Sequence, residues 1–306
     1  MTSPTSNDSD TAGSLATPLK GAPVAKAIRA QVATAIEGAG VSPHLVNVVV
    51  GDDPASAAYL GAIDKAATKV GARSSRITLP ADADTATVRA AVERAGADAD
   101  VHGLMVQFPL PRGIDADAVT SAVPASKDVD GITDASLGRI LAGRRVHTAP
   151  ATAAAVVELL LADEATTPTG RHVVIIGRSL VVGRPLGAML AAKGAGGDAT
   201  VTLCHTRTKD VASHTRRADI LVVAAGVRGL LTPDMVTSGA IVIDVGIHAV
   251  EGPDGKTTLA GDVDPGVAEV AGVLTPVPGG VGPVTNAILM RHVTAAACPD
   301  YLPPAW

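Results

Sequence analysis

Aromatic side chains and cysteines are scarce in this sequence of 306 residues. Only 1% of the residues are aromatic, so the chain has no platform on which nucleic-acid bases could stack. The two cysteines, Cys204 and Cys298, have no paired spacing, which excludes a disulfide scaffold and a structural zinc site. The net charge of −5 excludes a strongly basic binding surface. We therefore expect no nucleic-acid partner and no metal.

Long apolar runs and targeting signals are also missing from the sequence. No run approaches the roughly 18 apolar residues of a membrane helix, so no membrane partner is expected. The first 16 residues are polar, begin without a basic segment and lack the apolar core of a secretory signal. This pattern predicts a disordered tail over residues 1–17 and a cytoplasmic protein.

Aliphatic residues are plentiful, because 47% of the chain is hydrophobic despite the few aromatics. Short apolar runs that end in turns alternate with segments of helical length, which indicates an α/β fold with parallel sheets covered on both faces. We predict strands over residues 44–51, 73–80, 101–111, 171–177, 199–204, 219–226 and 240–246, and helices over 55–72, 85–97 and 284–297. The length favours two domains that share a cleft, and the polar turn over 163–170 indicates a seam between them.

A loop with two glycines follows the strand predicted over 171–177 and opens a helix. Gly177 and Gly183 bracket this loop, and amides at such a helix N-terminus form an anion site suited to a dinucleotide pyrophosphate. Arg178 and Ser179 add a guanidinium and a hydroxyl for the 2′-phosphate of NADP. An ordinary strand–helix turn fits the local pattern about equally well.

The end of the following predicted strand bears on the choice of cofactor. It carries His205 and Thr206, where an NAD-binding pattern would have an acidic residue for the ribose. The missing acid favours NADP over NAD.

Polar residues also stand where an open parallel sheet places its ligands. Gln107 lies near the carboxyl end of the strand predicted over 101–111, although a solvated glutamine in a turn is an alternative. Asp128 and Asp130 flank Val129, so their side chains point in opposite directions in an extended backbone. We expect one of them to be structural and the other to face the cleft, with two solvated acids in a turn as the alternative.

Three further features are less specific. The Pro- and Gly-rich run over 275–287 is rigid and lets the backbone approach a flat ligand, or it is simply the entry to a helix. Tyr59 is one of two tyrosines, and a structural role is the default for a lone aromatic. His292 and Cys298, near the last helix, are expected to be exposed or hydrogen-bonded residues rather than ligands.

Taken together, eight segments in this order resemble motifs of the bifunctional methylenetetrahydrofolate dehydrogenase/cyclohydrolase family: DPASAAYL, VQFPLP, KDVDGI, GRSLVVGRP, ATVTLCHTRT, AIVIDVGI, GDVD and TPVPGGVGP. The resemblance spans about residues 18–297. It implies an N-terminal αβα folate-binding catalytic domain (18–150, completed by 284–306) and a Rossmann-like NADP-binding domain (151–283). It also implies that the C-terminal helix returns to the first domain, and that the protein is a homodimer.

The resemblance implies a role for individual residues. Tyr59 takes the place of the family's pterin-stacking tyrosine, Gln107 that of its active-site glutamine, and Asp130 that of the aspartate that hydrogen-bonds the pterin. The loop expected to line the folate comprises Pro278, Gly279, Gly280 and Val281. The residues expected to bind NADP are Gly177, Arg178, Ser179, Gly183, His205, Thr206 and Ile247.

One position departs from the family pattern. The family carries its catalytic lysine four residues after the tyrosine, and Ile63 occupies that position here. Lys65 matches a second lysine of the pattern and lies about 200° around the helix from residue 63, so it does not substitute. Smaller departures are Ala151, where the family usually has Cys, and Val284, where it usually has Met.

The two reactions of the family depend differently on that lysine. Hydride loss from the methylene carbon leaves a cation stabilised by the adjacent nitrogens, so positioning suffices. Hydrolysis of the methenyl product needs proton transfer, which a positioned amine accelerates by about 10²–10⁴-fold. The sequence therefore predicts an NADP-dependent methylenetetrahydrofolate dehydrogenase whose cyclohydrolase step is lost or weak. The alternatives are a non-catalytic folate- or NADP-binding paralogue and an oxidoreductase for another one-carbon or specialised substrate.

Overall fold

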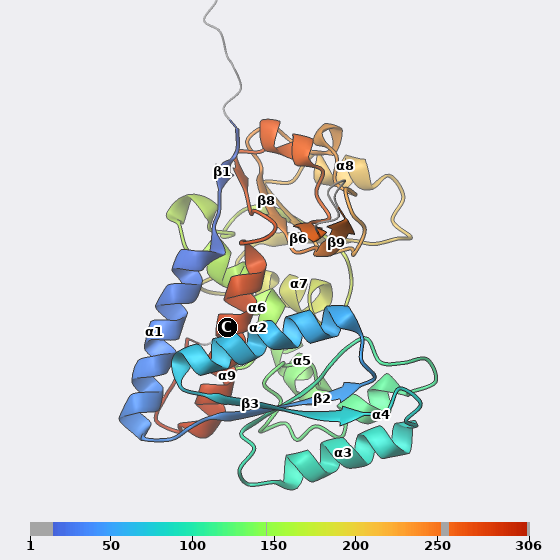
Figure 1. The fold of residues 1–306 in the computed structure, drawn as a ribbon. Helices are drawn as coiled ribbons and strands as arrows, with labels where there is room; N and C mark the ends of the chain where they lie inside the picture. The colour runs from blue at the N-terminus through green and yellow to red at the C-terminus, as the bar shows by residue number, and fades with distance from the viewer. Residues whose placement is uncertain (1–14, 145, 252–256, 305–306) are drawn as a thin grey trace, which may run out of the picture.

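The computed structural model describes residues 15–144, 146–251 and 257–304 (Figure 1). Within this part of the chain, a smaller sheet has three parallel strands in the order β3 (Arg73–Leu79), β2 (His44–Val50) and β4 (Gly103–Val106). It occupies the lower half of Figure 1 and is flanked by α2 (Pro54–Val70) and α3 (Thr85–Ala97).

A larger parallel sheet is formed mainly by the second half of the chain. Its strands are, in spatial order, β1 (Thr17–Pro18), β11 (Val273–Leu274), β8 (Ile241–Asp244), β7 (Ile220–Val223), β5 (His172–Ile176) and β6 (Thr200–Cys204). A separate antiparallel pair joins β9 (His248–Glu251) to β10 (Thr257–Ala260). The structure thus confirms the predicted α/β fold with a Rossmann-like parallel sheet.

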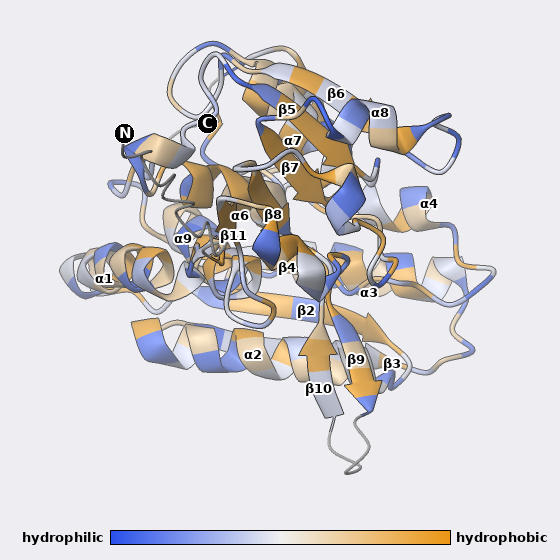
Figure 2. Cartoon of the chain, turned by 90° about the horizontal axis from the view of Figure 1, so that it is seen from above, coloured by the Kyte–Doolittle hydropathy of each residue, from blue (hydrophilic) through white to orange (hydrophobic). Residues whose placement is uncertain are grey.

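The remaining helices connect and cover these sheets. They are α1 (Gly21–Ala39), α4 (Ala116–Thr120), α5 (Asp134–Leu141), α6 (Ala151–Leu160), α7 (Gly183–Ala191), α8 (Val211–Thr215) and α9 (Val281–Ala297), with short 3₁₀ turns at Glu164–Thr166, Pro233–Met235 and Pro265–Glu269. Central strands β7 and β8 are buried along their whole length and appear orange in Figure 2, as expected for parallel strands covered on both faces. The core is built almost entirely of Ala, Val, Leu and Ile.

The C-terminal helix returns to the first half of the chain, as predicted. Helix α9 packs against α1, α2 and α6, and its side chains are buried over most of its length (Figure 1). It begins at Val281, three residues before the predicted start. Pro283 did not prevent this because a proline in the first turn of a helix removes an amide that has no intrahelical partner.

Other boundaries differ from those predicted. The apolar run over 101–111 forms a strand only over Gly103–Val106, since the prolines at 109 and 111 cannot donate to a sheet. The polar turn over 163–170 holds a 3₁₀ turn and leads into β5. The boundaries of the two domains stay a prediction. Most of the predicted tail lies outside the described residues.

Candidate functional site

The half of the candidate site that is predicted to bind folate, called the folate half below, combines Tyr59 of α2 with the segment around Asp130. Tyr59 is 36% exposed, which does not fit a purely structural ring in the core. Burial of its hydroxyl raises the pKa of Tyr59, and the negative charge of Asp130 raises this pKa further. The two side chains therefore lie within electrostatic range of each other, although they are 71 residues apart in the sequence.

Asp128 is the structural member of the acidic pair. It is 3% exposed, and its Oδ1 accepts hydrogen bonds from the amides of Gly131 (2.9 Å) and Ile132 (3.2 Å). Its Oδ2 accepts from the amide and the hydroxyl of Thr133 (2.9 and 2.6 Å) and from the Ser136 hydroxyl (2.6 Å). Asp128 thus ties the turn that precedes α5 to the first turn of that helix.

Asp130 has a different environment, two residues further on. It is half-buried, and no residue in the described part of the chain donates a hydrogen bond to its carboxylate. Burial, and secondarily the negative charge of Asp128, raise the pKa of Asp130 to about 7. Its acceptor capacity is therefore left for a ligand.

The environment of residue 63 is apolar. Ile63 is fully buried in the core, whereas Lys65 points to the exposed side of α2. The Gln107 side-chain amide donates to the carbonyl of Phe108 (2.8 Å), but its Oε1 is buried and has no hydrogen-bond partner within the described residues. A buried unsatisfied acceptor costs about 1–3 kcal/mol, a cost that a partner from outside the described chain would relieve.

In the half predicted to bind the cofactor, called the cofactor half below, the loop after β5 turns back tightly on itself. Gly177 has a φ of +129°, and a Cβ there would lie 2.1 Å from the carbonyl oxygen of Ala224. A Cβ on Gly183 would lie 2.0 Å from the Gly177 carbonyl oxygen. The Ser179 hydroxyl accepts from the amide of Val182 (3.1 Å), at the entry to α7. Glycines at both ends thus let the backbone form a cradle at a helix N-terminus, which fits a dinucleotide pyrophosphate.

The other predicted cofactor residues lie at the same edge of the larger sheet. Strands β5 and β6 are parallel neighbours, so the segments that follow them, with Arg178 and with His205 and Thr206, meet at their carboxyl ends. Arg178 and Thr206 are exposed, and no ion pair engages Arg178 within the described chain. Ile247, after β8, is 61% exposed. The loop Pro278–Gly280 adjoins the start of α1, where the Gly21 amide donates to Gly279 (2.8 Å).

His292 is hydrogen-bonded rather than exposed, which is one of the two outcomes predicted for it. This residue is 1% exposed, with Nδ1 hydrogen-bonded to the carbonyl of Val129 (2.8 Å), but Nε2 lacks a partner in the described structure. Burial lowers its pKa to about 4, so the ring is neutral and Nδ1 donates. His292 therefore braces the segment between Asp128 and Asp130 from α9.

Sequence reasoning missed a pair of buried acids near β8, Asp244 and Asp262, and their partner His248. Asp262 is fully buried and lies 2.7 Å from Nε2 of His248. Asp262 lies in the GDVD motif, so its presence was visible in the sequence. Its burial and its contact with His248 were not, because the fold brings these two residues together.

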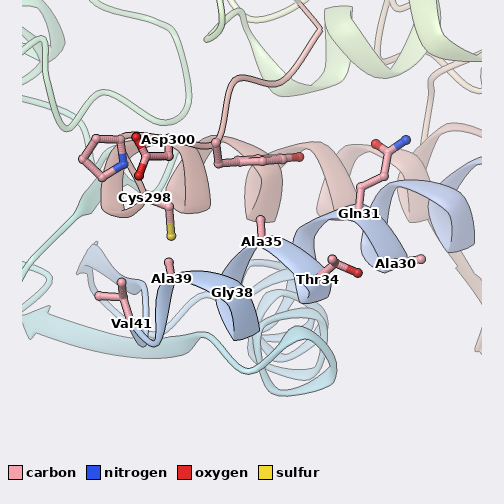
Figure 3. A pocket seen from close by; sticks show the side chains of 11 residues that line it. Ala30, Gln31, Thr34, Ala35, Gly38, Ala39, Val41, Cys298 and Asp300 are labelled. Carbon is pink, nitrogen blue, oxygen red and sulfur yellow. The ribbon is translucent and has the colours of Figure 1, made fainter.

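A groove of about 920 Å³ lies away from these residues, between α1 and the segment after α9 (Figure 3). Small residues of α1 and the residues from Cys298 to Tyr301 line it. The 17 residues of α9 span about 25 Å, which separates this groove from the loop before Val281. Over the described residues, no cluster of metal-binding side chains occurs, and no helix combines the length and apolar character needed to cross a bilayer.

The parallel sheet with a glycine cradle at its carboxyl edge defines a dinucleotide-binding α/β protein. Residues 19–130 match the family model described as tetrahydrofolate dehydrogenase/cyclohydrolase, catalytic domain, and residues 150–300 match the model of its NAD(P)-binding domain. The chain belongs to the tetrahydrofolate dehydrogenase/cyclohydrolase family, which confirms the resemblance.

Individual relatives agree over nearly the whole length. The chain is 45% identical to the bifunctional protein FolD of Syntrophobacter fumaroxidans over 287 residues, covering 92% of this chain and 96% of the relative. It is 47% identical to FolD of Nocardia farcinica over 283 residues, covering 91% and 96%.

Solved structures show the same fold. The FolD structure from Campylobacter jejuni matches with a TM-score of 0.84 and 36% identity, covering 93% of this chain and 99% of that one. The Trypanosoma brucei enzyme, solved with NADP cofactor and an inhibitor, matches with a TM-score of 0.85 and 34% identity, covering 92% and 97%.

Proposed function

We propose that the protein oxidises 5,10-methylenetetrahydrofolate to 5,10-methenyltetrahydrofolate with NADP, and that its cyclohydrolase step is lost or weak. The observation that carries the second half of the proposal is local. The position of the family's catalytic lysine is filled by a fully buried isoleucine, and the Oε1 of Gln107 is left without a partner.

The dehydrogenase step places few chemical demands on the chain. NADP, when bound, supplies the hydride acceptor, and the substrate nitrogens stabilise the cation that forms. The protein has to hold the folate in one orientation and exclude water. The ionised Asp130 would accept hydrogen bonds from the aminopyrimidine edge of the pterin, and Tyr59 would stack on its ring.

The cyclohydrolase step needs a group that moves protons, and the described site offers no good substitute for the lysine. Ile63 carries no proton, Lys65 is exposed on another side of α2, and the amide of Gln107 does not titrate. Asp130 titrates near neutrality but is assigned to holding the pterin. Hydration of the methenyl carbon therefore lacks the contribution of about 10²–10⁴-fold expected from a positioned acid or base.

The preference for NADP over NAD rests on Arg178 and Ser179 after β5, together with the lack of an acid at the end of β6. The exposed guanidinium of Arg178 has no competing partner in the described chain and suits a phosphate. The family relationship further supports a folate substrate and a homodimer, which sedimentation velocity would measure directly.

One assay separates the proposal from its competitors. Purified protein is mixed with methylenetetrahydrofolate and NADP⁺, and NADPH formation, methenyl accumulation and methenyl decay are recorded in parallel against a protein-free control. We expect NADPH and methenyl to rise together, with methenyl decaying at the control rate. Accelerated decay would contradict the loss of cyclohydrolase activity. Binding of both ligands without turnover would instead indicate a non-catalytic paralogue.

A further inference from the structure

Two buried carboxylates form a network at the carboxyl ends of β7 and β8. Asp244, the last residue of β8, is 5% exposed. It accepts hydrogen bonds from the amides of Gly246 (3.0 Å), Asp262 (2.9 Å) and Val263 (3.1 Å). Asp244 thereby fixes the backbone on which Asp262 stands.

Asp262 in turn binds two other segments. Its Oδ2 accepts from the amides of Ala225 (2.7 Å) and Gly226 (2.9 Å), which follow β7. Its Oδ1 accepts from Nε2 of His248 (2.7 Å), the first residue of β9. A Cβ on Gly246 would lie 2.2 Å from this oxygen, so the close packing depends on a glycine there. Asp262 is completely buried, whereas the His248 side chain is 23% exposed.

Of the two segments held by Asp262, the loop after β7 borders the cofactor cradle, and the segment of His248 contains the predicted cofactor residue Ile247. The Ala224 amide donates to the last residue of β5 (2.8 Å), and the Ala224 carbonyl closes over Gly177. Ala225 and Gly226 come next in the chain, and His248 follows Ile247 directly. If the 2′-phosphate binds near β6 and the pyrophosphate after β5, the strand order would place the nicotinamide half of the dinucleotide over β7 and β8.

We propose that His248 and Asp262 form a positioning pair that holds the loop after β7 and the segment at Ile247 in the geometry that receives the nicotinamide half of NADP. This inference rests on the proposed function, and it adds two residues that shape the cofactor site without touching NADP. His248 donates a hydrogen bond to Oδ1 of the buried Asp262 carboxylate, so that Oδ2 stays aimed at the two loop amides. In the described structure His248 bonds to the charged group of Asp262, which itself lies within electrostatic range of Asp244.

The pair is best tested at His248, because truncating the fully buried Asp262 could unfold the domain. His248→Leu removes the donor, and His248→Gln keeps an N–H donor within reach of Asp262. The control is His172→Leu. His172 lies at the amino end of β5 in the larger sheet, away from the carboxyl edge, and also bonds through Nε2, to the Thr202 hydroxyl (2.9 Å).

Two readouts are required, one of them independent of turnover. In the protein without ligands, amide hydrogen exchange at Ala225 and Gly226 should accelerate in His248→Leu and return towards the wild-type rate in His248→Gln. With NADP added, calorimetry should show about tenfold weaker binding for His248→Leu, recovery to within about threefold for His248→Gln, and no change for His172→Leu. The KM for the folate should stay unchanged.

The outcomes separate this inference from the proposed function. If NADP binds the wild type and neither exchange nor affinity changes in His248→Leu, the positioning pair is refuted while the function stands. Equal weakening in His248→Leu and His248→Gln would also refute it, since the hydrogen bond would then be irrelevant. If NADP does not bind the unmodified protein at all, the proposed function fails first.

Discussion

In the cofactor half of the molecule, Asp244 and Asp262 are saturated by hydrogen bonds from the chain itself, whereas in the folate half Asp130 and the Oε1 of Gln107 receive none from the described residues. Saturated carboxylates fix the backbone before any ligand arrives. Unsatisfied acceptors carry an energetic cost that a ligand can relieve. The contrast suggests that one half is preorganised by its own backbone, while the other completes its hydrogen bonds with the substrate.

Asp128→Ala should give the largest effect, on stability. The substitution leaves several buried donors of one turn without a partner, and we expect the free energy of unfolding to fall by roughly 3–5 kcal/mol. Urea denaturation measures it. The matched control is Asp130→Ala, which removes no hydrogen bond made by the described chain and should not lower the free energy of unfolding. Similar losses for both would mean that the two acids share one structural role.

Ile63→Lys should alter the chemistry of the folate half. An amine at this buried position would face desolvation, which lowers its pKa towards neutrality and suits proton transfer. We expect methenyl hydrolysis to rise on the order of 10²-fold, less if the pocket has repacked around the aliphatic side chain. Ile63→Met controls for packing, because it changes shape without adding an amine. A rise in both variants would remove the amine from the explanation.

Asp130→Ala should weaken folate binding selectively. Loss of a hydrogen-bonded carboxylate corresponds to about 1.5–3 kcal/mol, or about 10–150-fold in the folate KM, with NADP affinity little changed. Steady-state kinetics with each substrate varied in turn provide the test. Intact folate kinetics would reassign this half of the cleft and favour a different substrate.

Arg178→Ala should discriminate between the two nicotinamide cofactors. The guanidinium is exposed, so we expect the lower end of the range for a charge-assisted contact, about tenfold weaker NADP binding, with NAD affinity unchanged. Calorimetric titration with both cofactors measures this. Equal losses for NADP and NAD would show that Arg178 does not read the 2′-phosphate.

The smallest effect concerns pH. Because burial raises the pKa of Asp130 to about 7, its ligand-binding carboxylate is half protonated at neutrality and mostly protonated at pH 6. The folate KM should therefore rise about fivefold as the pH falls from 7 to 6. In Asp130→Asn this pH dependence should vanish. A flat profile in the wild type would mean that Asp130 stays ionised in the apo protein.

The raised pKa of Asp130 also affects folding stability, which it lowers as the pH rises, whereas folate binding improves. Between the ordinary value near 4 and about 7, the folded state binds more protons at Asp130 than the unfolded state does. The contribution of this residue to stability is therefore present at low pH and is lost as the pH rises through 7. Asp130→Asn should be more stable than the wild type at pH 8 and closer to it at pH 5, as thermal unfolding at both pH values would show.

Much of the architecture could be read from local patterns. The apolar runs of β2, β3, β5 and β8 and the helical segments of α2 and α3 appear within a few residues of the predicted bounds. These elements are set by short-range periodicity and turn residues, which the chain displays directly. The early start of α9 and the short β4 were missed because proline has opposite effects at a helix N-terminus and in a strand.

The features of the candidate site can also be divided into those visible in the sequence and those that depend on the fold. Glycine spacing, the acids of KDVDGI and the isoleucine at position 63 are visible in the sequence, and so is the family resemblance that they carry. Which of Asp128 and Asp130 is structural, the isolation of Gln107 Oε1 and the meeting of His248 with Asp262 depend on segments far apart in the chain. Only tertiary packing decides these, because burial and hydrogen-bond partners are properties of the folded surroundings and not of the residue itself.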